Sequence, residues 1–200
     1  RSVGHSQNAF ITESFIDELA YKAGEDPYAF RRRLLANSPA HVAVLDLVAM
    51  ESRWGKTDAG VYQGIAVHQS FGTLVAEVVD VSMVDGRARL ERVTCAVDCG
   101  IAVNPDQVRA QIESAVIFGL TAALKGRITI SDGAVVESNF HDYGMLRMDE
   151  APEIVVHIIP STGRPTGVGE PGTPPIAPAL ANALFAATGK RQRALPLSLG

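Results

Sequence analysis

One acidic residue stands in a segment with almost no neighbouring side chains. Glu170 lies in GVGEPGTPP, residues 167 to 175, between glycines and ahead of a run of prolines. Gly and Pro mark turns, and a carboxylate in a surface turn is normally just solvated. The glycines also permit the backbone to approach something bulky closely. The segment alone therefore leaves open a solvated turn and a functional acid.

Three further stretches carry unusual residues beside a glycine: RSVGHSQ at 1 to 7, VDCGIAVNP at 97 to 105 with Gln111 just beyond, and NFHDYGMLRM at 139 to 148. In the last of these we expect His141, Asp142 and Tyr143 to close a structural hydrogen-bond network, because most such side chains satisfy backbone groups. A hydrolase that pairs Glu170 with Asp98 or Asp142 has no spacing argument in its favour. Taken singly, none of the stretches assigns a function.

Several site classes are not supported by the motifs. The five histidines show no close His or Cys spacing of the kind that binds zinc, and Cys95 and Cys99 have no second pair. We expect the two cysteines to be buried packing residues. No G-x-S-x-G elbow is present, and no G-x-G-x-x-G opens a helix after a strand. The sequence thus predicts no metal held by side chains, no serine hydrolase and no dinucleotide fold.

Taken together, the four stretches resemble one family in the same order along essentially all 200 residues. The chain resembles the C-terminal part of the molybdenum-binding large subunit of the xanthine dehydrogenase and aldehyde oxidoreductase family. Within that family it is most similar to the bacterial isoquinoline 1-oxidoreductase beta subunit. This combination is far more specific than any single motif.

The resemblance implies roles for particular residues. RSVGHSQNAFITESFIDELA matches a cofactor-contacting segment and makes Arg1 and Gln7 candidates for cofactor binding. CAVDCGIAVNPDQVRAQIE matches a segment that ends in a cofactor-contacting glutamine, here Gln111. GVGEPGTPPIAPALANALF matches the segment with the essential glutamate of the family, here Glu170. The resemblance also makes Gly169 a candidate for cofactor binding, because a glycine leaves space for the cofactor beside Glu170.

The resemblance also implies a reaction. Such enzymes insert water-derived oxygen at an electron-poor carbon of an N-heteroaromatic ring or an aldehyde, with Glu170 as the general base. The implied cofactor is a molybdenum pterin, in bacteria usually molybdopterin cytosine dinucleotide. Two cysteines are too few for one four-cysteine cluster, so electrons would leave through a small subunit with two [2Fe-2S] clusters. The remaining part of the molybdenum large subunit is a further expected partner.

An alternative of another class is that these residues form a non-catalytic assembly module. Such a module would supply one wall of the cofactor site and a subunit interface. The first residue is Arg1 and not Met, from which we expect a fragment or a processed product. Its localisation, cytoplasmic or periplasmic, stays open.

Composition is typical of a folded globular protein. Apolar residues make up 46% and charged residues 20% of the 200 residues, typical of a globular chain. The net charge is −4 and the basic residues are scattered, so nucleic acid is not an expected partner. The longest apolar runs fall far short of the ~20 residues that span a bilayer.

The elements that must position these residues begin with helices. An apolar stripe over residues 7 to 23 predicts a helix closed by Gly24. Asp26 before Pro27 and Ser38 before Pro39 each predict a capped helix start. Residues 1 to 55 are accordingly expected to form a helical segment of the molybdenum-binding region.

Residues 56 to 200 are expected to form an α+β subdomain. Asp85-Gly86 predicts a hairpin between strands at 65 to 84 and 87 to 99. A helix over about 106 to 124 follows, and then short strands at 126 to 130, 134 to 139 and 153 to 159. Thr173 is expected to cap a last helix that ends at Gly189. The predicted class is α+β, a molybdopterin-binding domain fragment of the xanthine dehydrogenase type with N-terminal helices, a mixed hairpin and helix middle and a C-terminal helix.

Overall fold

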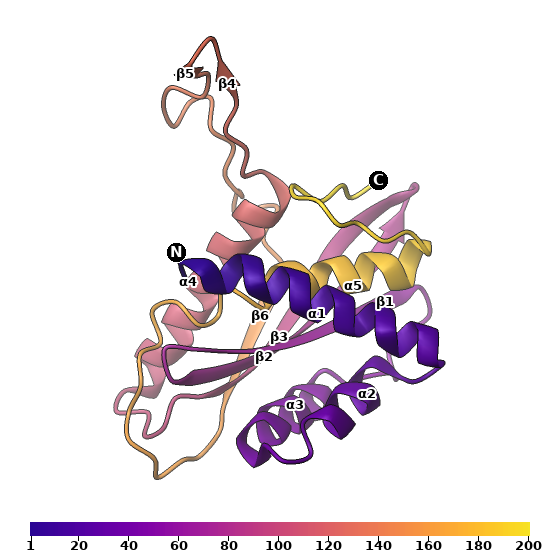
Figure 1. Ribbon diagram of the computed structural model, residues 1–200, viewed down its shortest axis with the longest axis vertical. Coiled ribbons are helices and arrows are strands. Elements are labelled where there is room, and N and C mark those ends of the chain that lie inside the picture. The colour runs from indigo at the N-terminus through magenta and orange to yellow at the C-terminus, as the bar shows by residue number, and fades with distance from the viewer.

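The computed structural model describes all 200 residues and contains five helices and six strands (Figure 1). They are, in chain order, α1 (Gly4–Ala23), α2 (Pro27–Leu34), α3 (Pro39–Glu51), β1 (Val61–Ser70), β2 (Thr73–Val84), β3 (Arg87–Asp98), α4 (Pro105–Leu124), β4 (Ile130–Ser131), β5 (Ala134–Val135), β6 (Glu153–Ile158) and α5 (Ile176–Thr188). The predicted α+β class is confirmed.

The main sheet has the strand order β1-β2-β3-β6. The first three strands pair antiparallel, and β6 joins β3 in parallel after the long excursion through α4. Asp85 and Gly86 both have positive φ, 49° and 77°, the conformation of a tight two-residue hairpin turn. The predicted turn at Asp85-Gly86 is therefore confirmed.

The prediction of one strand over residues 65 to 84 was wrong. The chain reverses at Phe71 and Gly72, so this region is most of β1 followed by β2. Both turn residues have positive φ, 53° and 84°. Such turns are normally predicted from Asn or Asp before Gly, whereas here the residue before Gly72 is phenylalanine, which is unusual in that conformation. This turn therefore has no signal in the sequence.

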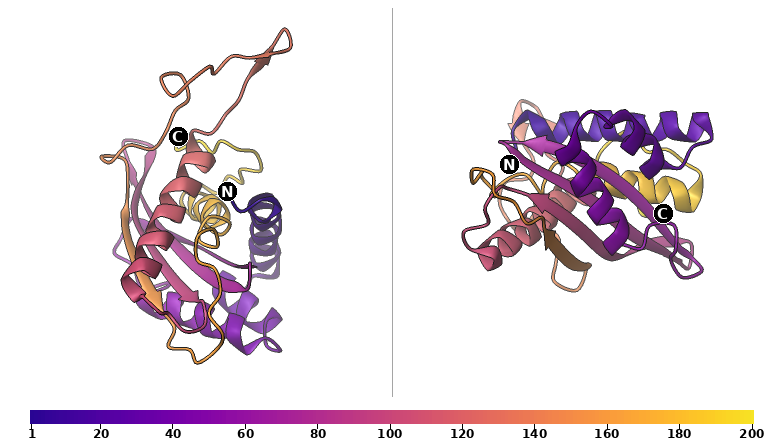
Figure 2. Two further views of the ribbon diagram at one scale, coloured as in Figure 1. Left: turned by 90° about the vertical axis from the view of Figure 1, so that its left-hand side faces the viewer. Right: turned by 90° about the horizontal axis from the view of Figure 1, so that it is seen from below.

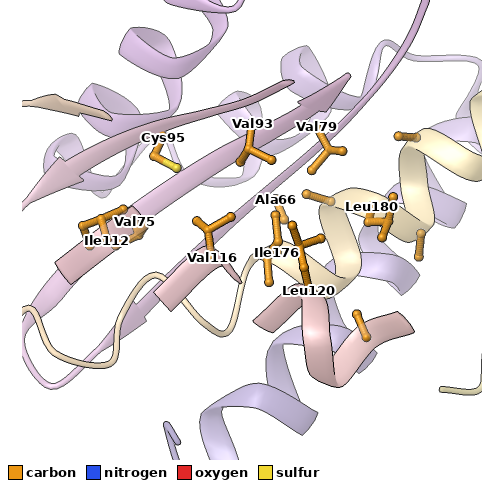
Figure 3. Packing of buried hydrophobic residues seen from close by; sticks show 14 of the residues in the cluster. Ala66, Val75, Val79, Val93, Cys95, Ile112, Val116, Leu120, Ile176 and Leu180 are labelled. Atoms are coloured by element: carbon orange, nitrogen blue, oxygen red, sulfur yellow. The ribbon is translucent and has the colours of Figure 1, made fainter. Parts of the chain in front are cut away.

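Helices cover both faces of the main sheet (Figure 2). Helices α4 and α5 pack on one face, where Ile112, Val116, Ile176 and Leu180 meet apolar strand residues (Figure 3). Helix α3 packs on the other face through a second buried cluster: Val44, Leu45, Val48, Ile65, Val67, Leu74, Ala76, Val78 and Ala96. This alternation follows from strand geometry, because successive side chains point to opposite faces.

Two glycines permit close contact between these layers. A Cβ at Gly64 of β1 would collide with the backbone of Ala179 and Ala183 in α5. A Cβ at Gly119 of α4 would collide with Ile176 at the start of α5. Helix α5 therefore rests directly on the sheet and on α4, which fixes where the preceding segment with Glu170 must run.

Helix starts only partly follow the predicted caps. Asp26 caps α2 as predicted, since its carboxylate accepts a hydrogen bond from the Ala29 amide at 2.9 Å. Helix α3 begins at Pro39 with Ser38 at the cap position, as predicted, although the Ser38 side chain makes no capping bond. The prediction for α5 was wrong, because Pro175 and not Thr173 occupies its cap position. Thr173 instead donates to the Ala115 carbonyl at 3.3 Å, because α4 lies within its reach.

Residues 126 to 150 form an extended arm that leaves the body at the end of α4 (Figure 1). The predicted strands at 126 to 130 and 134 to 139 shrink to the two-residue strands β4 and β5. The predicted strand at 153 to 159 is confirmed as β6. Strands β4 and β5 pair only with each other, and an isolated two-stranded sheet is only marginally stable, which explains why they are short.

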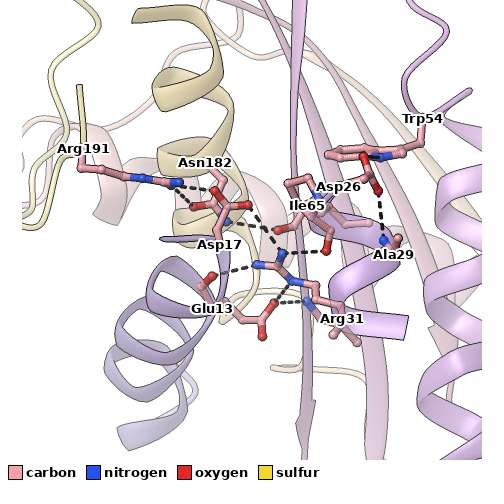
Figure 4. Close-up of polar contacts among 11 residues, drawn as sticks. Glu13, Asp17, Asp26, Ala29, Arg31, Trp54, Ile65, Asn182 and Arg191 are labelled. Atoms are coloured by element: carbon pink, nitrogen blue, oxygen red, sulfur yellow. Dashed lines mark hydrogen bonds and ion pairs between the residues drawn. The ribbon is translucent and has the colours of Figure 1, made fainter. Parts of the chain in front are cut away.

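A buried polar network joins α1, α2, α5 and β1 (Figure 4). Arg31, only 1% exposed, pairs with Glu13 at 2.8 Å and with Asp17 at 3.5 Å. Glu13 also accepts the Val67 amide at 2.9 Å, and Asp17 pairs with Arg191 at 2.7 Å. These contacts tie the N-terminal helices to the sheet.

The two predicted segments meet in the second buried cluster, which combines α3 with β1, β2 and β3. The division of the chain near residue 55 stays a prediction. No helix combines the length and the apolar character needed to span a membrane. Cys95 and Cys99 are 0% and 2% exposed, so their predicted role as buried packing residues is confirmed.

Candidate functional site

The first residues of the chain lie between α4 and the segment that carries Glu170. The Ser2 hydroxyl donates to the backbone carbonyl of Glu170 at 2.8 Å. The Arg1 guanidinium donates to Ser114 of α4 at 3.3 Å and lies 5.5 Å from the ring centroid of Phe118. Segments that are 168 residues apart in the chain therefore meet at one place.

Glu170 combines a held backbone with an unpaired acid. Its carbonyl accepts from Ser2 and also from the Thr173 amide, at 3.0 Å. The residue is half-buried, and its carboxylate oxygen Oε2 is buried without a hydrogen-bond partner. Buried polar atoms are nearly always paired, so this free oxygen leaves Glu170 able to accept a hydrogen bond or a proton from a bound group.

The segment that precedes Glu170 is anchored to the sheet by Thr73. This residue is fully buried, and its hydroxyl donates to the Gly167 carbonyl at 2.7 Å. A hydroxyl has a single proton, so the Thr166 hydroxyl, also 2.7 Å away, donates to Thr73 in turn. The Thr166 amide bonds the Cys99 carbonyl at 2.9 Å. Neither end of the segment is free to shift.

Gln111 lies beside Gly169. A Cβ built on Gly169 would be 3.8 Å from the Gln111 side-chain nitrogen, and no other atom would lie as close as 4 Å. Gly167 has nothing within 4 Å of such a Cβ. Gln111 itself is exposed on α4. The backbone ahead of Glu170 is therefore open on the side that Gln111 faces.

Gln7 lines a groove of about 590 Å³ together with Arg1, Phe118 and Pro174. Gln111 and Glu170 are not part of the lining of this groove. The structure thus brings Arg1, Gln111, Gly169 and Glu170 together around one segment. Gln7 is connected to them through the groove that it shares with Arg1.

Strained backbone leads into the site. Ser2 and Val3 have positive φ, 66° and 47°, which is an outlier for a β-branched residue such as Val3. Residues in such conformations cost of order 1–3 kcal/mol and persist only where the surroundings hold them. Ser2 is fully buried, whereas Val3 is 77% exposed. In this conformation the Ser2 side chain contacts Glu170, whereas the Val3 side chain points outward.

Residues 26–152 match the model of the molybdopterin cofactor-binding domain family. The chain belongs to this family. Its match includes Gln111, whereas Arg1, Gln7, Gly169 and Glu170 lie outside the matched residues. This match confirms the predicted resemblance to the molybdenum-binding large subunit of the xanthine dehydrogenase and aldehyde oxidoreductase family.

Individual proteins extend the match over nearly the whole domain. The beta subunit of isoquinoline 1-oxidoreductase from Brevundimonas diminuta is 37% identical over 98% of this chain. A nicotinate dehydrogenase subunit from Pseudomonas putida is 33% identical over 99% of it. The chain spans 26% of the length of the first relative and 18% of the second.

A solved structure shows the same fold. The aldehyde oxidoreductase from Desulfovibrio desulfuricans superposes on 98% of this chain with a TM-score of 0.76, at 14% sequence identity. The chain covers 40% of that protein. The predicted α+β fold of the xanthine dehydrogenase type is thereby confirmed.

The residues gathered here fit a molybdopterin. The unpaired Glu170 oxygen is an acceptor that lacks a donor, and Gly167 and Gly169 leave room beside it. The exposed Arg1 guanidinium and the amide of Gln111 supply charged and neutral donors of the kind that phosphate and pterin oxygens require.

His5 and His68 form a contact that the sequence analysis did not predict. His5 Nδ1 and His68 Nε2 are 3.0 Å apart, which joins the start of α1 to β1. Burial, followed by the charges of His5 and His41, lowers the pKa of His68 to about 4. The imidazole of His68 is therefore neutral at ordinary pH and can share one proton with His5.

The other acids considered from sequence have structural roles. Asp142 accepts from the amides of Ser138 and Asn139, both at 2.9 Å, and the Asn139 amide contributes most to lowering its pKa. Asp98 accepts the Gly100 amide at 3.1 Å. The expected structural role is confirmed for Asp142, whereas the side chains of His141 and Tyr143 make no hydrogen bond there and His141 only approaches Asp142 at 3.5 Å. No contact pairs Asp98 or Asp142 with Glu170.

Sequence reasoning missed Ser2 and Thr73. Both are small hydroxyl residues without a motif of their own, and each bonds a carbonyl far away in the chain. The only available signal for Ser2 was its place beside Arg1 in a turn before a helix.

Proposed function

We propose that this chain is part of a molybdenum hydroxylase in which Glu170 is the general base. The reaction inserts water-derived oxygen at an electron-poor carbon of an N-heteroaromatic or aldehyde substrate. One observation carries the proposal: the buried Glu170 oxygen lacks a partner although its backbone is held by Ser2 and Thr173. A base needs its acceptor atom free and its position fixed.

The proposed cofactor is a molybdopterin in its cytosine dinucleotide form. Arg1, Gln7 and Gln111 would hold it through their side chains, and Gly169 would let it approach the backbone. When bound, the group supplies the two-electron chemistry, which amino-acid side chains lack. Electrons would then pass to a small subunit with [2Fe-2S] clusters, and the remaining part of the large subunit would complete the site.

The chain's own residues supply position and proton transfer. Ser2, Thr73 and Thr173 hold the backbone on both sides of Glu170, so that its carboxylate meets the substrate region in one orientation. Pro171 restricts the next backbone angle. The substrate class is supported by the names of relatives, which specify isoquinoline and nicotinate in two cases and an aldehyde in a third.

The test replaces Glu170 by glutamine in the assembled enzyme. Glu170→Gln keeps the side-chain size and removes the base, so turnover should fall by about 10²–10⁴-fold. Glu153→Gln makes the same chemical change at an exposed position of β6 and should leave turnover unchanged. Molybdenum content is measured in all samples, and a near-normal rate in fully metallated Glu170→Gln enzyme would refute the proposal.

A second candidate function is the non-catalytic assembly module. The observation in its favour is an apolar stripe on the outside of α1, where Ile11, Phe15 and Leu19 are 64%, 57% and 41% exposed. In this case the domain provides a wall of the cofactor site and an interface, and Glu170→Gln would have little effect on turnover.

A further inference from the structure

The Ser2 side chain makes one hydrogen bond to the segment that carries Glu170, and its acceptor is a backbone carbonyl. Its hydroxyl bonds the Glu170 carbonyl at 2.8 Å and is not within reach of a second acceptor. The residue is 0% exposed. A buried donor on a carbonyl can hold the backbone of Glu170 without taking part in proton transfer.

Ser2 makes this contact from a strained backbone conformation. Its φ of 66° is uncommon for a residue with a Cβ, and Val3 follows at 47°. Helix α1 begins directly afterwards at Gly4. Because the helix is anchored by buried Ala9, Phe10 and Glu13, the chain must take a strained path to place the Ser2 hydroxyl on Glu170.

The contact limits the movement of the acid. The Glu170 carbonyl also closes a turn with the Thr173 amide at 3.0 Å, and Thr173 is tied to α4 through Ala115. Loss of the Ser2 donor would leave this turn as the only hold on that peptide group. The carboxylate, whose free oxygen has no contact of its own, would then lose its fixed orientation.

We propose that Ser2 is a positioning residue that holds the Glu170 peptide group so that the carboxylate stands ready for proton transfer. The inference rests on the proposed function of Glu170 as general base. Ser2 acts through the backbone and does not touch the reacting atoms. Its removal should lower the rate of the chemical step and leave substrate affinity largely intact.

Two substitutions separate the hydroxyl from the strain. Ser2→Ala removes the hydroxyl and keeps the Cβ at positive φ, whereas Ser2→Gly removes both and relieves the strain. If the strained Ser2→Ala variant does not fold, the Ser2→Gly variant, in which the strain is relieved, still tests the loss of the hydroxyl. Ser14→Ala is the matched control, because it deletes a hydroxyl in α1 that has no hydrogen-bond partner.

Kinetics of the assembled enzyme provide the first readout. Both Ser2 variants should reduce kcat by about 10-fold or more, as small misplacements of a catalytic group do, with KM within about twofold of the unchanged enzyme. Ser14→Ala should change neither constant. A rise in KM at constant kcat, or normal constants in both Ser2 variants, would overturn the inference.

Hydrogen exchange provides a second readout that does not depend on turnover. The Thr173 amide bonds the carbonyl that Ser2 holds, so its exchange should become about 3- to 10-fold faster in both Ser2 variants and stay unchanged in Ser14→Ala. Unchanged Thr173 exchange in both Ser2 variants would contradict the positioning role. If Glu170→Gln enzyme keeps its rate, the proposed function fails, whereas faster Thr173 exchange would still establish the Ser2 contact.

Discussion

Glu170 has two properties that general bases require. Its peptide group is held from two sides, and one carboxylate oxygen is buried without a donor. Asp98 and Asp142 lack the second property, since backbone amides already occupy their oxygens. At the scale of single residues, Glu170 differs from these two acids in its free oxygen. It differs from Glu77, whose Oε2 is also unpaired but whose side chain is 0% exposed, in being only half-buried.

His68 provides a prediction about pH at the same scale. Burial and the nearby His5 and His41 lower its pKa in the folded state to about 4, against 6.5 for an ordinary histidine. The unfolded chain therefore binds a proton near pH 6.5 that the folded protein binds only near pH 4. The contribution of His68 to folding stability should be constant above pH 6.5 and should decrease as the pH falls from 6.5 to 4.

This prediction can be checked by a titration of the imidazole ring protons by NMR. The His68 resonance should reach its titration midpoint only near pH 4. Thermal unfolding at pH 7 and pH 5 gives the matching energetic test, and His68→Asn should lose less stability between these pH values than the unchanged protein. A His68 midpoint near 6.5 would contradict the assigned environment.

At the scale of elements, the buried network around Arg31 determines how α1 and α2 sit on the sheet. The side chains of Arg31, Glu13 and Asp17 are at most 6% exposed. Buried charges are costly to remove from water and are retained only when their partners satisfy them. Arg31 meets this condition with additional bonds to the carbonyls of Glu13 and Pro27, at 2.7 Å and 3.2 Å.

Arg31→Met should therefore destabilise the protein by roughly 3–5 kcal/mol, because Glu13 stays buried without a cation, while Asp17 keeps only Arg191. Arg33→Met is the control on the same helix. Arg33 pairs with Glu25 in an exposed contact, with side chains 57% and 40% exposed, and its loss should cost less than about 1 kcal/mol. Urea unfolding measures both, and equal effects of the two substitutions would show that the network is not decisive.

At the scale of the whole molecule, two regions each carry several exposed apolar side chains. One is the stripe of Ile11, Phe15 and Leu19 on α1. The other is the arm of residues 126 to 150, where Phe140 is 81% and Met148 96% exposed. Single exposed apolar residues are ordinary, but contiguous ones mark interaction sites. The chain covers 26% of a relative's length, so the rest of a large subunit is a fitting partner for these surfaces.

The α1 stripe can be tested separately from catalysis. Ile11→Ser together with Phe15→Ser should weaken co-purification with the rest of the large subunit, and the loss should be about 10-fold or more, as when interface anchors are removed. The stability of the chain itself should change by less than about 0.5 kcal/mol per site, because both side chains are exposed. Lys22→Ser on the same helix is the control. Undiminished co-purification of the double variant would exclude the stripe as an interface.

Local signals in the sequence were sufficient for much of the fold. Asp26 before Pro27 marks the start of α2, Asp85-Gly86 marks the hairpin, and the apolar spacing of α4 marks its length. Each of these depends on contacts within a few residues, which any surrounding structure preserves. The resemblance of longer segments also indicated Glu170 as the important acid.

Only the tertiary structure decided how that acid is held. Ser2 meets Glu170 across 168 positions of the chain, and Thr173 bonds Ala115 and not the helix that it was expected to cap. A hydroxyl bonds whichever acceptor the packing of distant elements brings within reach, and local sequence does not encode that choice. The sequence therefore determined the fold class and, through the family resemblance, predicted Glu170 as the acid. The meeting of the residues before α1, α4 and the segment before α5 determined the surroundings of that acid.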